Sequence, residues 1–419
     1  MTNRAAALHP ASSPGWERYR DIRARTVELT ASLSAEDCAL QSMPDASPAK
    51  WHLAHTAWFF ETFVVVPTIP RYRPYDAAFK MLFNSYYNGV GDRHPRPQRG
   101  LLSRPSLDDV LAYRAHVDAA MHACCEVAMR DPSLAALIEL GLNHEQQHQE
   151  LILTDLLHLF SHNPTRPAIR PADVAARRQA AQRTWIACPA GIAHVGHAGD
   201  GFAFDNEGPR HRVWLEAFEL ASHPVTNGDY CAFIDDGGYR RPDLWLSLGW
   251  DTTVAQRWEA PLYWEREREQ WRCFTLQGMR DVDPDEPLAH VSYFEADAYA
   301  RWAGARLPTE FEWEAIARRV RVDDAQPATD SLPDAFGDVW EWTSSSYAPY
   351  PGFRPAAGAV GEYNGKFMCN QYVLRGASVA TPRGHSRVTY RNFFPPDARW
   401  QWSGMRLARG KQGGDESRL

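Results

Sequence analysis

The sequence has few cysteines, and none of them are paired at metal-binding spacing. Seven cysteines are scattered through 419 residues, and none forms a C-x-x-C motif. Zinc ribbons and zinc fingers need such closely spaced pairs, so the sequence excludes them. It also argues against a disulfide-stapled secreted fold, because such folds are short and rich in cysteine. Scattered cysteines instead indicate free, mostly buried thiols in a reducing cytoplasm.

Long apolar runs and clusters of one charge are also missing. No apolar stretch approaches the ~20 residues that a membrane-spanning helix needs. The start of the chain, MTNRAAALHPASSPGW, lacks the apolar core of a signal peptide. The formal net charge is −7, and no basic run or aromatic-interleaved basic patch suggests nucleic-acid binding. We therefore expect a globular, cytoplasmic protein that binds neither membranes nor nucleic acid.

The two halves of the chain differ in pattern. Thirteen of the sixteen tryptophans lie from Trp185 onward, where short apolar stretches alternate with Gly, Pro, Asp and Asn. This half is expected to be an irregular α+β domain with one clear helix, which starts at Ser292. Before it, apolar residues recur at helical spacing. The four helical segments are residues 17–34, 47–66, 106–129 and 131–162.

Four long helices with one irregular excursion, residues 67–105, predict a four-helix bundle. Expected helix caps are Ser47 followed by Pro48, Ser106 followed by acids, and Asp131 followed by Pro132. The excursion is rich in Pro, Tyr and Arg, and a loop this long inside a compact domain is usually functional or disordered. Its aromatic content argues against disorder. We expect a first domain at residues 1–162, a linker at 163–184 and a second domain at 185–419.

The stretch HEQQH places His144 and His148 at i and i+4 on one helical face, where two imidazoles can bind one metal ion. The same letters spell the zinc-peptidase motif, which needs a further ligand downstream. His158 follows His148 on the same predicted helix, ~15 Å along its axis, and cannot reach the same ion. A solvated polar helix face is the alternative interpretation.

A second helix offers a better third ligand. In WHLAHTAWFFE, His55 shares a helical face with Trp51, Trp58 and Phe59, whereas His52 falls partly off this face and is the weaker candidate. Bundle cores place side chains of facing helices around metals. Three imidazoles can hold zinc or Fe(II), and a facial set of three nitrogens leaves open positions on octahedral iron. The alternative is that His55 is an ordinary core histidine.

Two tyrosines of the excursion add a possible chemical role. Tyr86 and Tyr87, in NSYYN, carry phenols that can donate a proton or a hydrogen atom during oxygen chemistry. The alternative is that they only pack at the surface.

Several longer motifs together resemble one known family. SPAKWHLAHTAWFFETF, LFNSYYNGVGDRHPRPQRGLLSRP and GLNHEQQHQELILTDLLH are similar to the N-terminal DinB-like bundle of the ergothioneine sulfoxide synthases, the EgtB family. HVSYFEADAYARWAGARLPTEFEWE, GDVWEWT and YRNFFPPDARWQWSGMRLA resemble the formylglycine-generating-enzyme-like domain, of C-type-lectin-like fold, that this family attaches to its bundle. The resemblance covers nearly the whole chain, in order. It implies a DinB-like four-helix bundle followed by an α+β domain of that type.

The resemblance implies an iron-dependent oxidoreductase. In this family, non-haem Fe(II) and O2 couple the thiol of cysteine or γ-glutamylcysteine to the imidazole C2 of hercynine (Nα-trimethylhistidine), which gives a hercynyl sulfoxide. The family's iron ligands carry over onto His55, His144 and His148. Glu145, within the H-E-x-x-H spelling, is therefore not expected to act as a peptidase base. The sequence carries no indication of an oligomeric state.

The resemblance also implies substrate contacts. Gln147 matches a position that contacts the hercynine imidazole. Arg96 and Arg99, in RPQR, match a pair that binds the carboxylate of the sulfur donor, a task that suits guanidinium groups. Asn392, in YRNFF, matches a residue near the hercynine carboxylate. Aromatic side chains, abundant in the second half, commonly bind trimethylammonium cations.

Phe393 and Phe394 distinguish this chain from one branch of the family. That branch has Trp-Asp at these positions, where the acid holds the donor's amino group, and a catalytic tyrosine in its second domain. The stretch YPGFRPAAGAVGEYNGKFM offers no convincing counterpart of that tyrosine. The chain instead resembles the branch whose active-site tyrosines come from NSYY, which favours free cysteine as the donor.

Other activities stay open at this point. Selenoneine synthase joins hercynine to a selenosugar with the same histidines, although FNSYYN favours the sulfur enzyme. Ovothiol synthase typically carries an extra methyltransferase domain, which this sequence lacks. A zinc peptidase, a formylglycine-generating enzyme with copper held by paired cysteines, and a non-catalytic lectin-like binding module are the alternatives from other classes.

Overall fold

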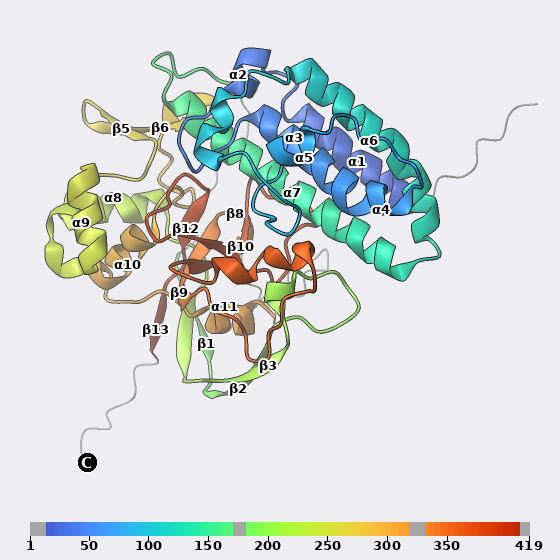
Figure 1. Cartoon of the computed structure of the whole chain (residues 1–419). Helices are drawn as coiled ribbons and strands as arrows, with labels where there is room; N and C mark the ends of the chain where they lie inside the picture. Colours follow the sequence, from blue (N-terminus) through green and yellow to red (C-terminus); the bar gives the residue numbers. More distant parts are fainter. Residues whose placement is uncertain (1–13, 171–181, 319–331, 333, 411–419) are drawn as a thin grey trace, which may run out of the picture. The chain divides into compact units, whose positions relative to one another are not determined.

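The computed structural model describes residues 14–170, 182–318, 332 and 334–410 (Figure 1). The chain forms two compact units. The first comprises the residues through Ser85 together with Asp92–Ile152, and the second comprises Tyr86–Gly91 together with the chain from Leu153 onward. The expected linker, residues 163–184, lies partly outside the described residues. The expected boundaries at 162 and 184 stay predictions.

Four long helices build the first unit. They are α1 (Pro14–Glu28), α3 (Ala49–Phe60), α6 (Leu107–Ala128) and α7 (Pro132–Ser161), whose last residues belong to the second unit. A short helix, α2 (Ala35–Ala39), joins α1 to α3. All four predicted helices are present, although α1 ends at Glu28 rather than Ser34 and α3 ends early in a wider turn, the π-helix η1 (Glu61–Val65).

Two of the three predicted caps are confirmed. Ser106 Oγ accepts a hydrogen bond from Asp109 N at 3.1 Å, and Asp109 accepts one from Ser106 N at 2.9 Å, a capping box that starts α6. Asp131 accepts from the backbone at the start of α7. The prediction for Ser47 is wrong, since the cap position of α3 is Pro48. The Ser47 hydroxyl accepts a hydrogen bond from Nη1 of buried Arg99 at 2.8 Å.

The bundle core contains a buried carboxylate that ties its helices together. Glu145 of α7 is fully buried and accepts hydrogen bonds from Arg23 of α1 at 3.0 Å and Arg114 of α6 at 2.9 Å. Thr26 of α1 donates a third bond at 2.7 Å. Arg114 also donates to the Leu53 carbonyl of α3 at 2.8 Å. One ionic cluster therefore touches all four long helices.

The excursion between α3 and α6 is fastened to the bundle by side chains. It contains the short helices α4 (Val66–Thr68), α5 (Phe79–Leu82) and η2 (Arg96–Leu101). Buried Glu61 accepts from the hydroxyls of Tyr72 at 2.8 Å and Tyr113 at 2.7 Å. The indole N–H of Trp58 donates to the Lys80 carbonyl at 3.0 Å.

The second unit is built from short strands around a central sheet. The sheet has the order β11-β10-β9-β12, and β8 pairs in parallel with β10. Its strands are β8 (Phe336–Asp338), β9 (Trp340–Ser346), β10 (Tyr372–Ser378), β11 (Asn392–Phe394) and β12 (Ser403–Met405). A second sheet, β1-β4-β13, joins β1 (Trp185–Cys188), β4 (Phe218–Ala221) and β13 (Ala408–Gly410) in antiparallel fashion.

Two smaller sheets and several short helices complete this unit. The hairpin pairs β2 (Gly191–Val195) with β3 (His211–Leu215), and the meander contains β5 (Trp264–Glu267), β6 (Gln270–Thr275) and β7 (Gly278–Asp281). The helices are α8 (Asn227–Asp235), α9 (Ser247–Gln256), α10 (Tyr293–Trp302) and α11 (Glu310–Ala317). The 3₁₀ turns are η3 (Asp205–Glu207), η4 (Gly238–Arg240), η5 (Pro242–Leu244), η6 (Ala359–Glu362) and η7 (Gly365–Phe367).

Of these helices only α10 was predicted, with a start at Ser292, and the structure confirms it. Ser292 is the residue that caps the helix. The others span eight to ten residues. Helices this short show little periodicity, and their stability comes from packing against the rest of the domain.

Buried arginine–glutamate pairs hold the strands of the second unit. Arg406 of the segment after β12 contacts Glu341 of β9 at 2.8 Å, and both side chains are fully buried. The Trp313 indole of α11 donates to the same carboxylate at 2.7 Å.

Across the described residues, no helix is both long and apolar enough to cross a membrane.

The Glu145 cluster makes a stability prediction. Replacing Glu145 with Gln removes the carboxylate that buried Arg23 and Arg114 share and leaves Arg23 with Asp118 as its remaining acidic partner. The free energy of unfolding at pH 7 should therefore fall by ~3–5 kcal/mol. Burial by itself would raise the pKa of Glu145, but the two guanidinium groups lower it to about 2, below its usual 4.5. The stabilisation is therefore present above pH 4.5 and is lost as the pH falls toward 2.

Denaturant unfolding at several pH values measures this effect. Glu139→Gln is the matched control, because this carboxylate of α7 pairs with Arg18 at the surface and should contribute less than ~1 kcal/mol. Equal losses for the two variants at pH 7 would contradict the assignment of Glu145 as the core ion of the bundle.

Candidate metal centre

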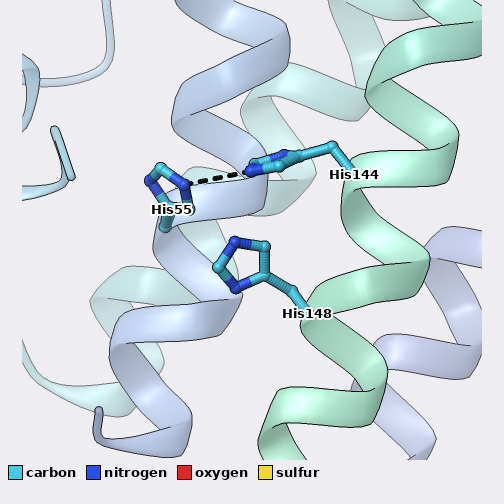
Figure 2. Close-up of side chains that lie close together, drawn as sticks. All are labelled: His55, His144 and His148. Carbon is cyan, nitrogen blue, oxygen red and sulfur yellow. Dashed lines mark hydrogen bonds between the residues drawn. The ribbon is translucent and has the colours of Figure 1, made fainter. Parts of the chain in front are cut away.

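Three histidines from two helices meet inside the first unit. His55 lies on α3, and His144 and His148 lie one turn apart on α7. Figure 2 shows the three imidazoles turned toward one another. All three are buried, and one nitrogen from each lies within 4.8 Å of the others. The structure thus brings together the three histidines that the sequence singled out.

The spacing of the ring nitrogens suits a common ligand. Nε2 of His55 lies 3.3 Å from Nε2 of His144. Metal–imidazole bonds of ~2.1 Å place neighbouring ligand nitrogens roughly 3 Å apart. No other group of three histidine, cysteine or acidic side chains with such spacing occurs among the residues that the structure describes.

Hydrogen bonds decide which nitrogens face the centre. Nδ1 of His55 lies 2.6 Å from the Phe83 carbonyl oxygen. Since a carbonyl only accepts, Nδ1 of His55 carries the proton and Nε2 keeps its lone pair. Nδ1 of His148 lies 2.8 Å from Nδ1 of His52. His52, the weaker candidate from the sequence, is therefore a hydrogen-bonding neighbour of His148 and not a member of the group of three.

Aromatic rings surround the three imidazoles. The rings of Trp51 and Trp58 both stack on His55, with centroids 4.5 and 5.4 Å away, and Phe59 packs against His144 at 4.7 Å. Burial lowers the pKa of His144 to about 4. Burial, together with His144, also holds the pKa of His55 well below its usual range. The imidazoles are therefore neutral at physiological pH, as metal binding requires.

The two predicted arginines occupy different surroundings. Arg99 is buried, and its guanidinium carbon lies 3.4 Å from the centroid of the Trp51 ring. Arg96 is exposed and donates a hydrogen bond to the Asp45 carbonyl. Gln147 is half-buried on α7, one position before His148.

The predicted tyrosines belong to the second unit. The rings of Tyr86 and Tyr87 lie 4.7 Å apart, and Tyr87 is buried. Lys366 donates to the Tyr86 carbonyl, and its ammonium lies 4.7 Å from the centre of the Tyr86 ring. Glu362 accepts from the backbone N–H groups of Asn88 and Gly89 at 3.0 and 2.7 Å. Nothing in the sequence pointed to this pairing of residues 86–89 with η6 and η7.

The predicted β11 residues lie beside this tyrosine segment. Phe393 stacks on Tyr347 with centroids 4.1 Å apart. The ring centroid of Phe367 lies 5.9 Å from that of Phe393 and 5.2 Å from that of Tyr86. Phe367 therefore contacts both a predicted residue of β11 and a predicted tyrosine. Asn392 is half-buried, and its side-chain oxygen accepts from Phe393 N at 2.9 Å.

Phe394 lies further along the same strand. It packs against Trp400, with ring centroids 6.1 Å apart.

Sequence reasoning missed the arginines that surround Glu145. The sequence did carry one signal for Arg114. This arginine continues the helical spacing of Val110, Val117 and Met121, three apolar residues that are all buried. A charged residue at a core position predicts a buried ionic partner.

Comparison with known proteins places the chain in a family. Residues 18–152 match the DinB superfamily, and residues 171–330 and 322–411 match the sulfatase-modifying factor enzyme 1-like domain. The hercynine oxygenase of Mycolicibacterium thermoresistibile is 34% identical over 428 residues, which cover 93% of this chain and 93% of that protein. The chain belongs to the hercynine oxygenase family. The hercynine oxygenase of Mycobacterium tuberculosis is likewise 34% identical, over 92% of this chain and 96% of its own.

Membership of the hercynine oxygenase family confirms several expectations. The resemblance to the ergothioneine sulfoxide synthases is confirmed, as is the fold class of a helical DinB-type domain followed by a mixed helix-and-sheet domain. The chain is an oxidoreductase of this family, and these relatives do not favour the selenoneine alternative. The formylglycine-generating enzyme of Streptomyces coelicolor is 27% identical over only 58% of this chain, although 94% of that enzyme is covered.

The group of three histidines, His55, His144 and His148 (the triad), leads to a prediction about metal content. Wild-type protein loaded anaerobically with Fe(II) should retain about one ion per chain, because three neutral imidazoles converge. His55→Ala and His144→Ala should lose most of it, as measured by elemental analysis after desalting.

His158→Ala serves as the matched control, since this histidine lies on the same helix but outside the triad. It should keep the wild-type iron content. Retention of iron by His55→Ala would show that α3 does not contribute a ligand.

Proposed function

We propose that this chain is a sulfoxide synthase of ergothioneine biosynthesis. It uses Fe(II) and O2 to join the thiol of cysteine to the imidazole C2 of hercynine, which gives hercynylcysteine sulfoxide. The observation that carries this proposal is the buried group of three neutral histidines, in a chain 34% identical to a hercynine oxygenase over nearly its whole length. The free cysteines suit a reducing compartment, and we propose a cytoplasmic location.

The residues present fit a resident Fe(II) ion. His55, His144 and His148 would hold it through three neutral nitrogens, which leaves positions open for substrates. When bound, the ion supplies the redox chemistry with O2. The protein adds no negative charge to the set, because the nearby carboxylate of Glu145 is occupied by Arg23 and Arg114. An uncompensated cation favours the thiolate over the thiol of the sulfur donor.

The surroundings of the triad support the binding of a small polar donor. Trp51, Trp58 and Phe59 exclude water from the imidazoles, which strengthens electrostatic interactions there. Arg99 is proposed to bind the carboxylate of the donor, because a guanidinium stacked on an aromatic ring is held in a defined orientation. Arg96 is proposed as its exposed partner. Gln147 is proposed to contact the hercynine imidazole.

The remaining proposed roles fall on residues of the second unit and follow from the family resemblance. Burial raises the pKa of Tyr87, so its phenol keeps the proton at neutral pH and can act as a donor. Tyr86 is the alternative donor. Asn392 is proposed to contact the hercynine carboxylate. Phe393 and Phe394 offer no acid for a donor's amino group, which favours cysteine over γ-glutamylcysteine.

A competition assay tests the proposed function. Protein loaded with Fe(II) under anaerobic conditions is given hercynine with cysteine, γ-glutamylcysteine and a selenosugar, and air is then admitted. Mass spectrometry should show hercynylcysteine sulfoxide as the main product. A γ-glutamyl product would overturn the interpretation of Phe393 and Phe394. Iron-loaded protein that forms no hercynine adduct would overturn the proposed function.

Substitution of the arginines tests how the donor is bound. Arg99→Met removes a charged hydrogen-bonding partner of the donor carboxylate, so KM for cysteine should rise by about 10–100-fold, while kcat changes less. Arg96→Met should raise KM by a smaller factor, because solvent screens an exposed guanidinium.

Iron content measured in both variants separates a binding defect from damage to the triad, since Arg99 stacks on Trp51. An unchanged KM in Arg99→Met, with iron retained, would assign the donor carboxylate to a different residue.

A further inference from the structure

His52 lies against the far side of one of the three clustered histidines. It precedes His55 by one turn of α3, and its side chain is only 2% exposed. Its Nδ1 lies 2.8 Å from Nδ1 of His148, with ring centroids 5.0 Å apart. Two imidazole nitrogens at this distance form a hydrogen bond, in which one carries the proton and the other supplies the lone pair.

The direction of this bond follows from the geometry of the triad. Figure 2 shows one ring nitrogen of His148 directed toward His55 and His144. Since Nδ1 is engaged by His52, the nitrogen available to the centre is Nε2. A neutral imidazole that binds a metal through Nε2 carries its proton on Nδ1. His148 therefore donates, and His52 accepts.

His55 also has a hydrogen-bond acceptor at its Nδ1, but this acceptor belongs to the backbone. Its Nδ1–H donates to the backbone carbonyl of Phe83 at 2.6 Å. Carbonyls and carboxylates are the usual acceptors behind metal-binding histidines. For His148 the acceptor is a neutral side chain from the opposite helix, 96 residues away in sequence. It orients the ring without adding negative charge to the site.

We propose that His52 is a positioning residue of the metal centre. By accepting the Nδ1 proton of His148, it fixes the tautomer and ring plane of that histidine and directs Nε2 to the ion. It is not a fourth ligand, because a neutral His52 that accepts at Nδ1 carries its proton on Nε2, and the group of clustered histidines does not include it. The inference rests on the proposed metal site of the triad, but it does not depend on the substrates.

Binding of Co(II) to the metal-free protein tests this role. His52→Phe removes the acceptor but keeps a planar ring, so Co(II) affinity should fall by about 10–100-fold and the d–d absorption bands should shift. His52→Asn places an amide oxygen near the position of Nδ1, so it should restore most of the affinity. His122→Phe, a change at an exposed histidine of α6 in the same unit, should leave both affinity and spectrum unchanged.

The outcomes separate positioning from packing. If His52→Phe binds Co(II) like the wild type with the same spectrum, the proposal is wrong. Equal losses in His52→Phe and His52→Asn, with lowered melting temperatures of both metal-free proteins, would assign His52 to packing alone and also overturn it. Rescue by His52→Asn, with an unchanged melting temperature, supports it.

The same titration distinguishes this inference from the proposed function. Failure of the wild type to bind Co(II) at all would overturn both the metal site and the role of His52. A wild type that binds Co(II) with the expected variant effects, but whose Fe(II) form makes no sulfoxide, would support the role of His52 and overturn only the proposed reaction.

Discussion

The buried carboxylate of Glu145 is the constraint on which the candidate metal centre depends. It lies between the two histidines of α7 in sequence, and its contacts with Arg23 and Arg114 fix how α7 is rotated against α1 and α6. Buried ion pairs of this kind contribute little net stability compared with a well-packed apolar core, but breaking one is costly. The cluster therefore acts mainly on the register of the helices. That register in turn directs His144 and His148 toward His55 of α3.

The same contacts explain why the H-E-x-x-H spelling does not describe a peptidase. A peptidase glutamate must keep its carboxylate available to a water molecule at the metal. Here both oxygens of Glu145 are taken, one by Arg23 and the other by Arg114 and Thr26. The carboxylate balances buried arginines, and the three imidazoles remain a neutral set. Neutral imidazole ligands leave the positive charge of a bound metal ion uncompensated, which suits chemistry that depends on this charge.

The excursion between α3 and α6 is divided between the two units. Its beginning and end are fastened to the bundle, for example through Trp58 and Arg99. Its centre, Tyr86–Gly91, belongs to the second unit, where Glu362 and Lys366 bind its backbone. The placement of the two tyrosines is thus decided by side chains more than 270 residues further along the chain. Folding of the second unit is consequently part of assembling the candidate tyrosine site.

The sequence by itself determined the features that rest on local periodicity. Helical spacing placed His144 and His148 on one face and directed His55 inward, and the caps at Ser106 and Asp131 marked the starts of α6 and α7. Longer motifs identified the family. These signals are readable because a helix fixes, over a few residues, which side chains share a face.

Only the tertiary structure decided which partner each polar side chain meets. His52 is hydrogen-bonded to His148, 96 residues away in sequence, and Glu145 to Arg23, 122 residues away. The Ser47 hydroxyl accepts a hydrogen bond from Arg99, and the cap position of α3 is Pro48. Local sequence carries no information on such pairings, because a buried polar group bonds to whichever partner the packing of distant elements brings within reach. Apart from α10, the short helices of the second unit escaped prediction for a related reason, since their stability comes from packing and not from their own sequence.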